Sequence, residues 1–163
     1  MKKNFPLFVA LVLLTFALWA VSAASAADTL TIRKLAFAED IQGLGNYTPR
    51  DSARFTLDDV CMIYVETGGF AMPLTPDTED EYNVDLAVDV AIKLPQTGRL
   101  IVFQPDMATL ATKVRSELPA YFLGFSFSFE GWTPGNFLLE VGLRDNIGAQ
   151  IVSQDMAFQL VEP

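Results

Sequence analysis

The stretch from Tyr82 to Lys93, YNVDLAVDVAIK, decides the fold class of this chain. From Val84 to Ile92, large apolar side chains at every second position alternate with small or charged ones. A period of two over this length places one face in a core and the other in water, which is typical of a β-strand. A helix would scatter these β-branched residues around its circumference. We therefore predict a strand over 82–93.

The same alternation recurs toward the C-terminus. Leu123–Phe129 and Phe137–Leu143 each carry large apolar residues at every second position. Pro134-Gly135 marks a turn between these two strands, and Pro95–Gly98 separates the long strand from a further one at Arg99–Gln104.

Three more strands complete the prediction. Asp58–Glu66 is apolar on both faces, which is typical of a central strand. Leu30 and Ile32 mark a first strand, and Ile151–Leu160 forms a last one. Most gaps are too short for a parallel crossover. The pattern therefore predicts an all-β, immunoglobulin-like antiparallel β-sandwich of about seven or eight strands.

One segment departs from the rhythm of the strands. Apolar residues recur there at near-helical spacing, at Met107, Leu110, Val114 and Leu118. Asp106 could cap a helix at this place, and Pro119 would end it. We predict a short helix or an ordered loop over 106–118.

Residues 1–26 have the three parts of a signal peptide. Lys2 and Lys3 precede the apolar run Leu7–Val21, and Ala24-Ser25-Ala26 fits the A-x-A cleavage pattern. The run is shorter than the ~20 residues of a spanning helix, so we expect cleavage rather than an uncleaved anchor. Cleavage after Ala23 is the near alternative. The prediction is a single domain over 27–163, exported to the periplasm or the cell exterior.

Charge and composition exclude several functions. Removing residues 1–26 leaves 9 basic and 20 acidic residues, a net charge of −11. Such a surface disfavours nucleic acid and anionic lipid, whose phosphates need Lys and Arg. The chain has no histidine, so Ser-His-Asp and Cys-His sites are excluded. Cys61, the one cysteine, is expected to be a buried thiol, with an intermolecular disulfide as the alternative.

Carboxylate pairs are the remaining enzymatic candidates. Asp85 and Asp89 share a strand face roughly 13 Å apart by strand rise, too far for glycoside hydrolysis without a neighbouring strand's carboxylate. Glu130 with Glu140 is a second pair. A solvated sheet face explains these residues better. We predict no catalytic residues, no cofactor and a non-enzymatic protein.

An acidic segment offers a weak calcium site. Its carboxylates are Asp77, Glu79, Asp80 and Glu81. Calcium prefers oxygen ligands of this kind, but the D-x-[DN]-x-[DN]-G register is missing. We expect a solvated acidic loop there, with calcium binding as the alternative.

The order of several motifs resembles a known group of proteins. Ile41–Pro49 (IQGLGNYTP) precedes Tyr64-Val65-Glu66, and Pro134–Val141 (PGNFLLEV) leads to Arg144-Asp145. This order is similar to that in uncharacterised bacterial secreted proteins with an immunoglobulin-like sandwich. The resemblance covers about residues 41–160. It implies a fold and an exported setting, and no reaction.

Two functions fit these observations. The first is a non-catalytic exported module that binds another protein or an envelope component, by analogy with other sandwich domains. The second is a carbohydrate-binding module, with or without calcium, which needs an exposed aromatic platform. Tyr47, Tyr121 and Trp132 are the candidates for that platform. The exposure of these three rings separates the two hypotheses.

Overall fold

A computed structural model describes residues 29–76, 78 and 80–162. Within these ranges the chain forms nine β-strands and no helix, and so no helical segment there suits a membrane crossing. The predicted signal peptide lies outside the described residues. The strands are β1 (Thr31–Gly43), β2 (Asn46–Pro49), β3 (Arg54–Thr56), β4 (Val60–Gly68), β5 (Tyr82–Lys93), β6 (Leu100–Val114), β7 (Tyr121–Ser128), β8 (Gly135–Asp145) and β9 (Gln150–Val161).

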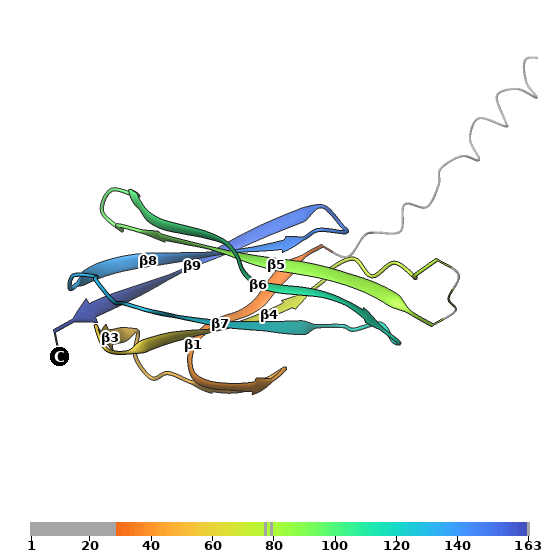
Figure 1. Cartoon of the computed structure of the whole chain (residues 1–163), viewed down its shortest axis with the longest axis horizontal. Helices are drawn as coiled ribbons and strands as arrows, with labels where there is room; N and C mark the ends of the chain where they lie inside the picture. The colour runs from red at the N-terminus through yellow and green to blue at the C-terminus, as the bar shows by residue number, and fades with distance from the viewer. Residues whose placement is uncertain (1–28, 77, 79, 163) are drawn as a thin grey trace, which may run out of the picture.

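The strands form two sheets that pack face to face (Figure 1). One sheet has the order β2-β1-β4-β7 and the other the order β3-β9-β8-β5-β6. Neighbouring strands are antiparallel except for the short β3, which pairs in parallel with β9. The prediction of an immunoglobulin-like antiparallel β-sandwich is confirmed.

The core lies between the sheets and is built from the alternating positions of the predicted strands. On β5, the inward side chains from Val84 to Ile92 are all buried, because β8 and β6 flank the strand on its two sides. One end of the core is aromatic, with Phe55 in contact with Phe37, Phe129 and Phe158 at ring-centroid distances of 5.2 to 6.1 Å. Aromatic contacts of this kind add to the stabilisation from burial.

The predicted helix over 106–118 is wrong, because most of this segment is the second half of β6. Leu110 lies opposite Leu86 and Val114 opposite Tyr82, so the segment continues the ladder that begins at Leu100. Its inward residues Leu110 and Val114 are four positions apart, a spacing that fits a period of two as well as a helix period. Pairing with β5 selected the strand, because the backbone groups along that side of β5 need partners.

Candidate functional site

The first half of β6 carries an unusual concentration of exposed apolar side chains. Leu100 is 53% exposed, Ile101 41%, Val102 37% and Phe103 57%. Successive residues of a strand point to opposite faces, so apolar groups are exposed on both faces here. We call Leu100–Gln104 the apolar edge. Isolated exposed apolar residues are ordinary, but a contiguous group of them marks an interaction surface.

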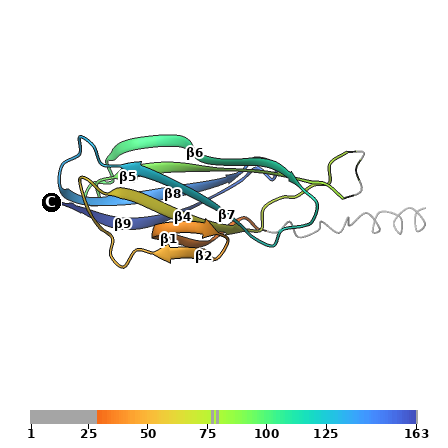
Figure 2. The same cartoon turned by 60° about the horizontal axis from the view of Figure 1, so that its bottom comes forward.

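The apolar edge is held beside β5 by a hairpin, with an irregularity at Ile101, since Lys93 lies opposite Leu100 and Ile92 opposite Val102. Ala91 lies opposite Phe103, and the Leu94 N–H donates to the Arg99 carbonyl at 2.9 Å. Gly98 closes the turn at a φ of 67°, a conformation that glycine adopts without strain. Among the described strands β6 pairs with β5 only, at the rim of the five-stranded sheet (Figure 2). Every second residue of such an edge turns its N–H and C=O outward.

Two of the other three sheet edges, β2 and β3, are protected against strand pairing. β2 spans four residues and ends at Pro49, and β3 spans three and begins at Arg54. Both devices, short length and a proline or charge, prevent a further strand from adding to an edge. β7 exposes small side chains at Gly124, Ser126 and Ser128 rather than large apolar ones. Neither β7 nor the apolar edge carries a charge or a proline, and the two edges differ in the size of their exposed side chains.

A bulge separates the apolar edge from the second half of β6. Three residues, Pro105 to Met107, stand opposite the single residue Asp89 of β5. Asp106 has a φ of 52°, which is uncommon for a residue other than glycine. Its N–H donates to Asp89 Oδ1 at 2.9 Å. The bulge therefore kinks β6, and together with the irregularity at Ile101 it leaves Val102–Gln104 as the regular part of the apolar edge.

An ion-pair network fastens this bulge to the outer face of the sheet. The Arg144 guanidinium donates to Asp89 at 2.8 and 3.2 Å and also contacts the Asp106 carboxylate. Burial alone would raise the pKa of the Asp89 carboxyl. The hydrogen bonds from Arg144 and from the Asp106 N–H, together with the Arg144 charge, outweigh this and lower the pKa of Asp89. Asp89 and Arg144 are therefore both charged, and the ion pair between them holds the kink of β6 in place.

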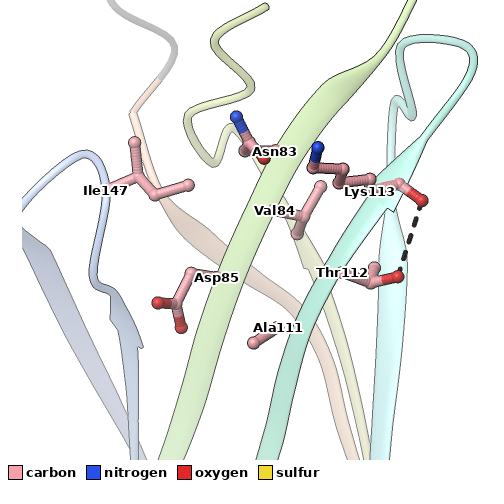
Figure 3. A pocket seen from close by; sticks show the side chains of 7 residues that line it. All are labelled: Asn83, Val84, Asp85, Ala111, Thr112, Lys113 and Ile147. Carbon is pink, nitrogen blue, oxygen red and sulfur yellow. Dashed lines mark hydrogen bonds between the residues drawn. The ribbon is translucent and has the colours of Figure 1, made fainter. Parts of the chain in front are cut away.

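A shallow pocket of about 350 Å³ lies beside the second half of β6 (Figure 3). Its lining is Asn83, Val84, Asp85, Ala111, Thr112, Lys113 and Ile147. Asp85 accepts a hydrogen bond from Asn146, and Lys113 forms an ion pair with Glu81 at 3.5 Å. The charged groups at this pocket thus have partners within the chain.

Two of the three predicted platform residues, Tyr47 and Tyr121, lie at the ends of one row of stacked rings that also contains Tyr64 and Phe122, and Trp132 lies apart from this row. Tyr47 is half-buried and stacks on Tyr64 at 4.1 Å, beneath the bent β1–β2 hairpin. The Tyr64 ring is fully covered, and its hydroxyl accepts from the Gly45 N–H and donates to Glu66.

The row of stacked rings continues from Tyr64 to Phe122 of β7, at a ring-centroid distance of 6.1 Å. Tyr121 is half-buried at the start of β7 and stacks on Phe122. Trp132 packs edge-on against Phe129 and Phe137 at the aromatic end of the core. Tyr47 and Tyr121 thus belong to one row of stacked rings, whereas Trp132 packs against the core at a separate place.

The acidic candidates are distributed as follows. Asp77 and Glu79 lie outside the described residues, Asp80 is exposed, and Glu81 pairs with Lys113. Among the residues that the structure describes, no group of three or more His, Cys, Asp or Glu side chains could hold a metal ion.

The carboxylate pairs considered for catalysis are also engaged or separated. Glu140 on β8 accepts from Lys93 at 2.6 Å, whereas Glu130 follows β7 of the other sheet. Asp89 is held by Arg144. Asp85 and Asp89 share the outer face of β5 as predicted, but Asp89 is a structural ion-pair partner there and not simply a solvated group.

Cys61 is fully buried on β4, facing Phe127 of β7 across the ladder. Burial raises the pKa of this thiol to about 12, against a smaller lowering by the Arg50 charge. The expectation of a buried, unreactive thiol fits this position.

No protein-family model matches the sequence, and no curated protein matches it. Among solved structures the chain is similar to the CARDB domain of a protein from Pyrococcus furiosus, crystallised in complex with di-metal ions. The sequences are 14% identical, the match covers 82% of this chain and 92% of that one, and the TM-score is 0.34. A likeness of this degree assigns no ligand to this chain. The grouping with bacterial secreted proteins stays a prediction.

The apolar edge is the feature that sequence reasoning missed. Arg99–Gln104 was predicted as a strand, but nothing in that prediction distinguished a rim strand from a buried one. The available signal was the run of four large apolar residues at Leu100–Phe103, with no alternation, directly before Pro105. Such a run also fits a strand covered on both faces, so its exposure becomes visible only with the strand order.

Proposed function

We propose that this chain is an exported, non-catalytic β-sandwich module that binds a protein through the apolar edge of β6. The observation that carries the proposal is the exposure of the four large apolar residues Leu100–Phe103 on a rim strand. A protein ligand suits this edge, because a partner strand supplies N–H and C=O groups for the outward backbone of β6. Apolar side chains on both faces then add contact area and selectivity.

A carbohydrate-binding function has less support. Sugar recognition needs exposed ring faces, whereas Tyr47 stacks on Tyr64 and Trp132 packs against Phe129 and Phe137. A catalytic function is likewise less supported, because the carboxylates of Asp89 and Glu140 are each paired with a cation. Export rests on the pattern of residues 1–26.

Site-directed photo-cross-linking in cells that express the full chain tests the binding surface. A photoreactive phenylalanine analogue at Phe103 is expected to give a defined protein adduct. The same analogue at Thr109, an exposed position of β6 beyond the bulge, serves as the matched control and is expected to give none. Equal labelling at both positions, or none at Phe103, would refute binding through this edge.

Export is tested separately on the same cells. The protein recovered from the periplasmic or extracellular fraction is expected to begin at Ala27, as N-terminal sequencing would show. Intact Met1 on membrane-bound material would contradict the cleavage.

A further inference from the structure

Two opposite charges border the shallow pocket beside the second half of β6 without meeting. Asp85 of β5 lies opposite Ala111 of β6. Two residues further along the ladder, Asn83 lies opposite Lys113, so the carboxylate and the ammonium stand at diagonal positions of neighbouring strands. Figure 3 shows these two charged groups pointing to different parts of the hollow and not toward each other. The pocket thus has a negative and a positive group with space between them.

The space between these charges exists because the rest of the lining is small or turned away. Ala111 offers only a methyl group there, and Val84 is 2% exposed because it turns into the core. Ile147, in the turn between β8 and β9, forms an apolar wall. The volume of about 350 Å³ lies at the lower end of the range for small-molecule sites. The pocket therefore offers a small ligand apolar surface as well as two charges.

One oxygen of the Asp85 carboxylate is held in place, and the other is left for a ligand. Its Oδ1 accepts from the Asn146 side chain at 2.9 Å, and its backbone carbonyl accepts from the Asn146 N–H at 3.0 Å. Arg144 donates in turn to the Asn146 side chain at 3.1 Å, which fixes the orientation of that amide. No described residue donates to Asp85 Oδ2, although each oxygen of an ionised carboxylate accepts two hydrogen bonds. This oxygen is therefore placed to accept from a cationic group.

Another part of the pocket offers hydrogen-bond donors. The Lys113 ammonium has three N–H groups, and its contact with Glu81 is long, at 3.5 Å. Asn83 lies opposite Lys113 on β5, and its side-chain amide has no hydrogen-bond partner among the described residues. Both side chains line the same hollow (Figure 3). A charged and a neutral donor at one place suit a carboxylate.

We infer that the shallow pocket binds a free α-amino acid with an apolar side chain. Asp85 accepts from its ammonium group, Lys113 and Asn83 donate to its carboxylate, and its side chain packs against Ile147. A zwitterion uses both charges of the pocket, whereas a simple cation or anion leaves one of them without a counter-charge. It also has no net charge, so the predicted exported chain, at −11, does not repel it. This site is independent of the proposed binding through the apolar edge.

Titration with L-leucine, followed by NMR of the isotope-labelled protein, tests the site. The protein is purified from cells that express the full chain. The backbone amides of Ala111 and Lys113 are expected to shift saturably. The dissociation constant should be on the order of 1 mM, because an open pocket covers little of the ligand. The amide of Val102, on the apolar edge, should not shift.

Two analogues of leucine test whether the ligand must be a zwitterion. Leucinamide keeps the ammonium group and lacks the carboxylate, whereas N-acetyl-leucine keeps the carboxylate and lacks the ammonium group. Each should bind at least about tenfold more weakly than leucine, because a hydrogen bond to a charged group is lost. The two analogues also represent the first and the last residue of a peptide, so they separate a free amino acid from a peptide end.

Matched variants test the residues of the pocket. Asp85→Asn keeps Oδ1 for Asn146 but replaces Oδ2 with an NH₂ group, and it should weaken leucine binding at least about tenfold. Asp155→Asn, at an exposed position on the same face of the sheet, is the control and should bind leucine like the parent. Glu81→Gln should tighten binding, because it removes the carboxylate that competes for Lys113.

Three results would refute the inference. Leucine that shifts no amide of the pocket shows that the site does not bind it. Leucinamide or N-acetyl-leucine that binds as tightly as leucine shows that one of the two charges is not used. Equal binding by Asp85→Asn and Asp155→Asn shows that the Asp85 carboxylate does not contact the ligand. None of these results bears on the cross-linking at Phe103, so failure of the proposed function is a separate outcome.

Discussion

Replacing Asp145 with asparagine should destabilise the domain far more than a one-atom change suggests. Asp145 ends β8 and is 1% exposed. Its Oδ2 accepts from the Ala71 N–H at 2.7 Å, and its Oδ1 accepts from the N–H groups of Ile147 and Gly148 at 3.0 and 2.9 Å. One carboxylate thus joins the segment after β4 to the β8–β9 turn.

The magnitude follows from the number of acceptors. An asparagine side chain keeps one oxygen for Ile147 and Gly148 but turns its NH₂ toward the Ala71 N–H. A buried donor without an acceptor costs about 1–3 kcal/mol, and bonds to a charged group are the stronger ones that are lost. Asp145→Ala removes all three acceptor contacts and should cost more. Domains of this size are stabilised by only ~5–15 kcal/mol in total.

Urea unfolding followed by tryptophan fluorescence measures this effect, since Trp132 packs against Phe129 and Phe137 of the core. With a urea dependence of about 1–3 kcal/mol per molar, a loss of ~2 kcal/mol shifts the midpoint by roughly 1 M. Asp51→Asn, an exposed aspartate, is the control and should stay within about 0.5 kcal/mol. If Asp145→Asn unfolds at the same midpoint as Asp51→Asn, the buried carboxylate does not hold these segments together.

Two further predictions concern ionisable groups. Cys61 should resist a maleimide at pH 8 until urea is added, because burial raises its pKa to about 12 and keeps the thiolate scarce; rapid native labelling would contradict this. The pKa of Asp89 is lowered in the folded state, so the ionised Asp89 carboxylate stabilises the fold at pH values above the ordinary carboxyl pKa of about 3.9. This stabilisation is lost as the pH falls through the lower pKa of the folded state. Asp89→Asn should therefore flatten the loss of stability between about pH 5 and pH 2 relative to the parent. An unchanged acid profile would show that the ion pair with Arg144 contributes nothing.

Local alternation was enough to predict most of the strands. β5, β7 and β8 each have one face in the core and large apolar residues at every second position, so period and burial agree. The segment after Asp106 misled the same reasoning because Leu110 and Val114 satisfy both a period of two and a helical spacing. Only the pairing of this segment with β5, a contact distant in sequence, selects between the two.

The partners at the candidate sites could not be predicted in the same way. Asp89 and Arg144 are 55 residues apart, and Tyr47 reaches Tyr64 only because β1 and β2 fold back over their own sheet. The sequence shows the charges and the rings, but the strand order decides which of them meet. The same holds for the apolar edge, whose exposure depends on β6 being the last strand of its sheet.

The two halves of β6 differ because the bulge at Pro105–Met107 gives them different neighbours. Beyond the bulge, Leu110 and Val114 pack against the core, as inward positions of a sandwich strand should. Before it, Val102 stands opposite Ile92, which is 2% exposed, and yet Val102 itself is 37% exposed. A purely structural edge would be expected to carry polar or charged side chains here, as edge strands commonly do. The exposure of four large apolar residues in succession at Leu100–Phe103 is the reason to look for a binding partner at this strand.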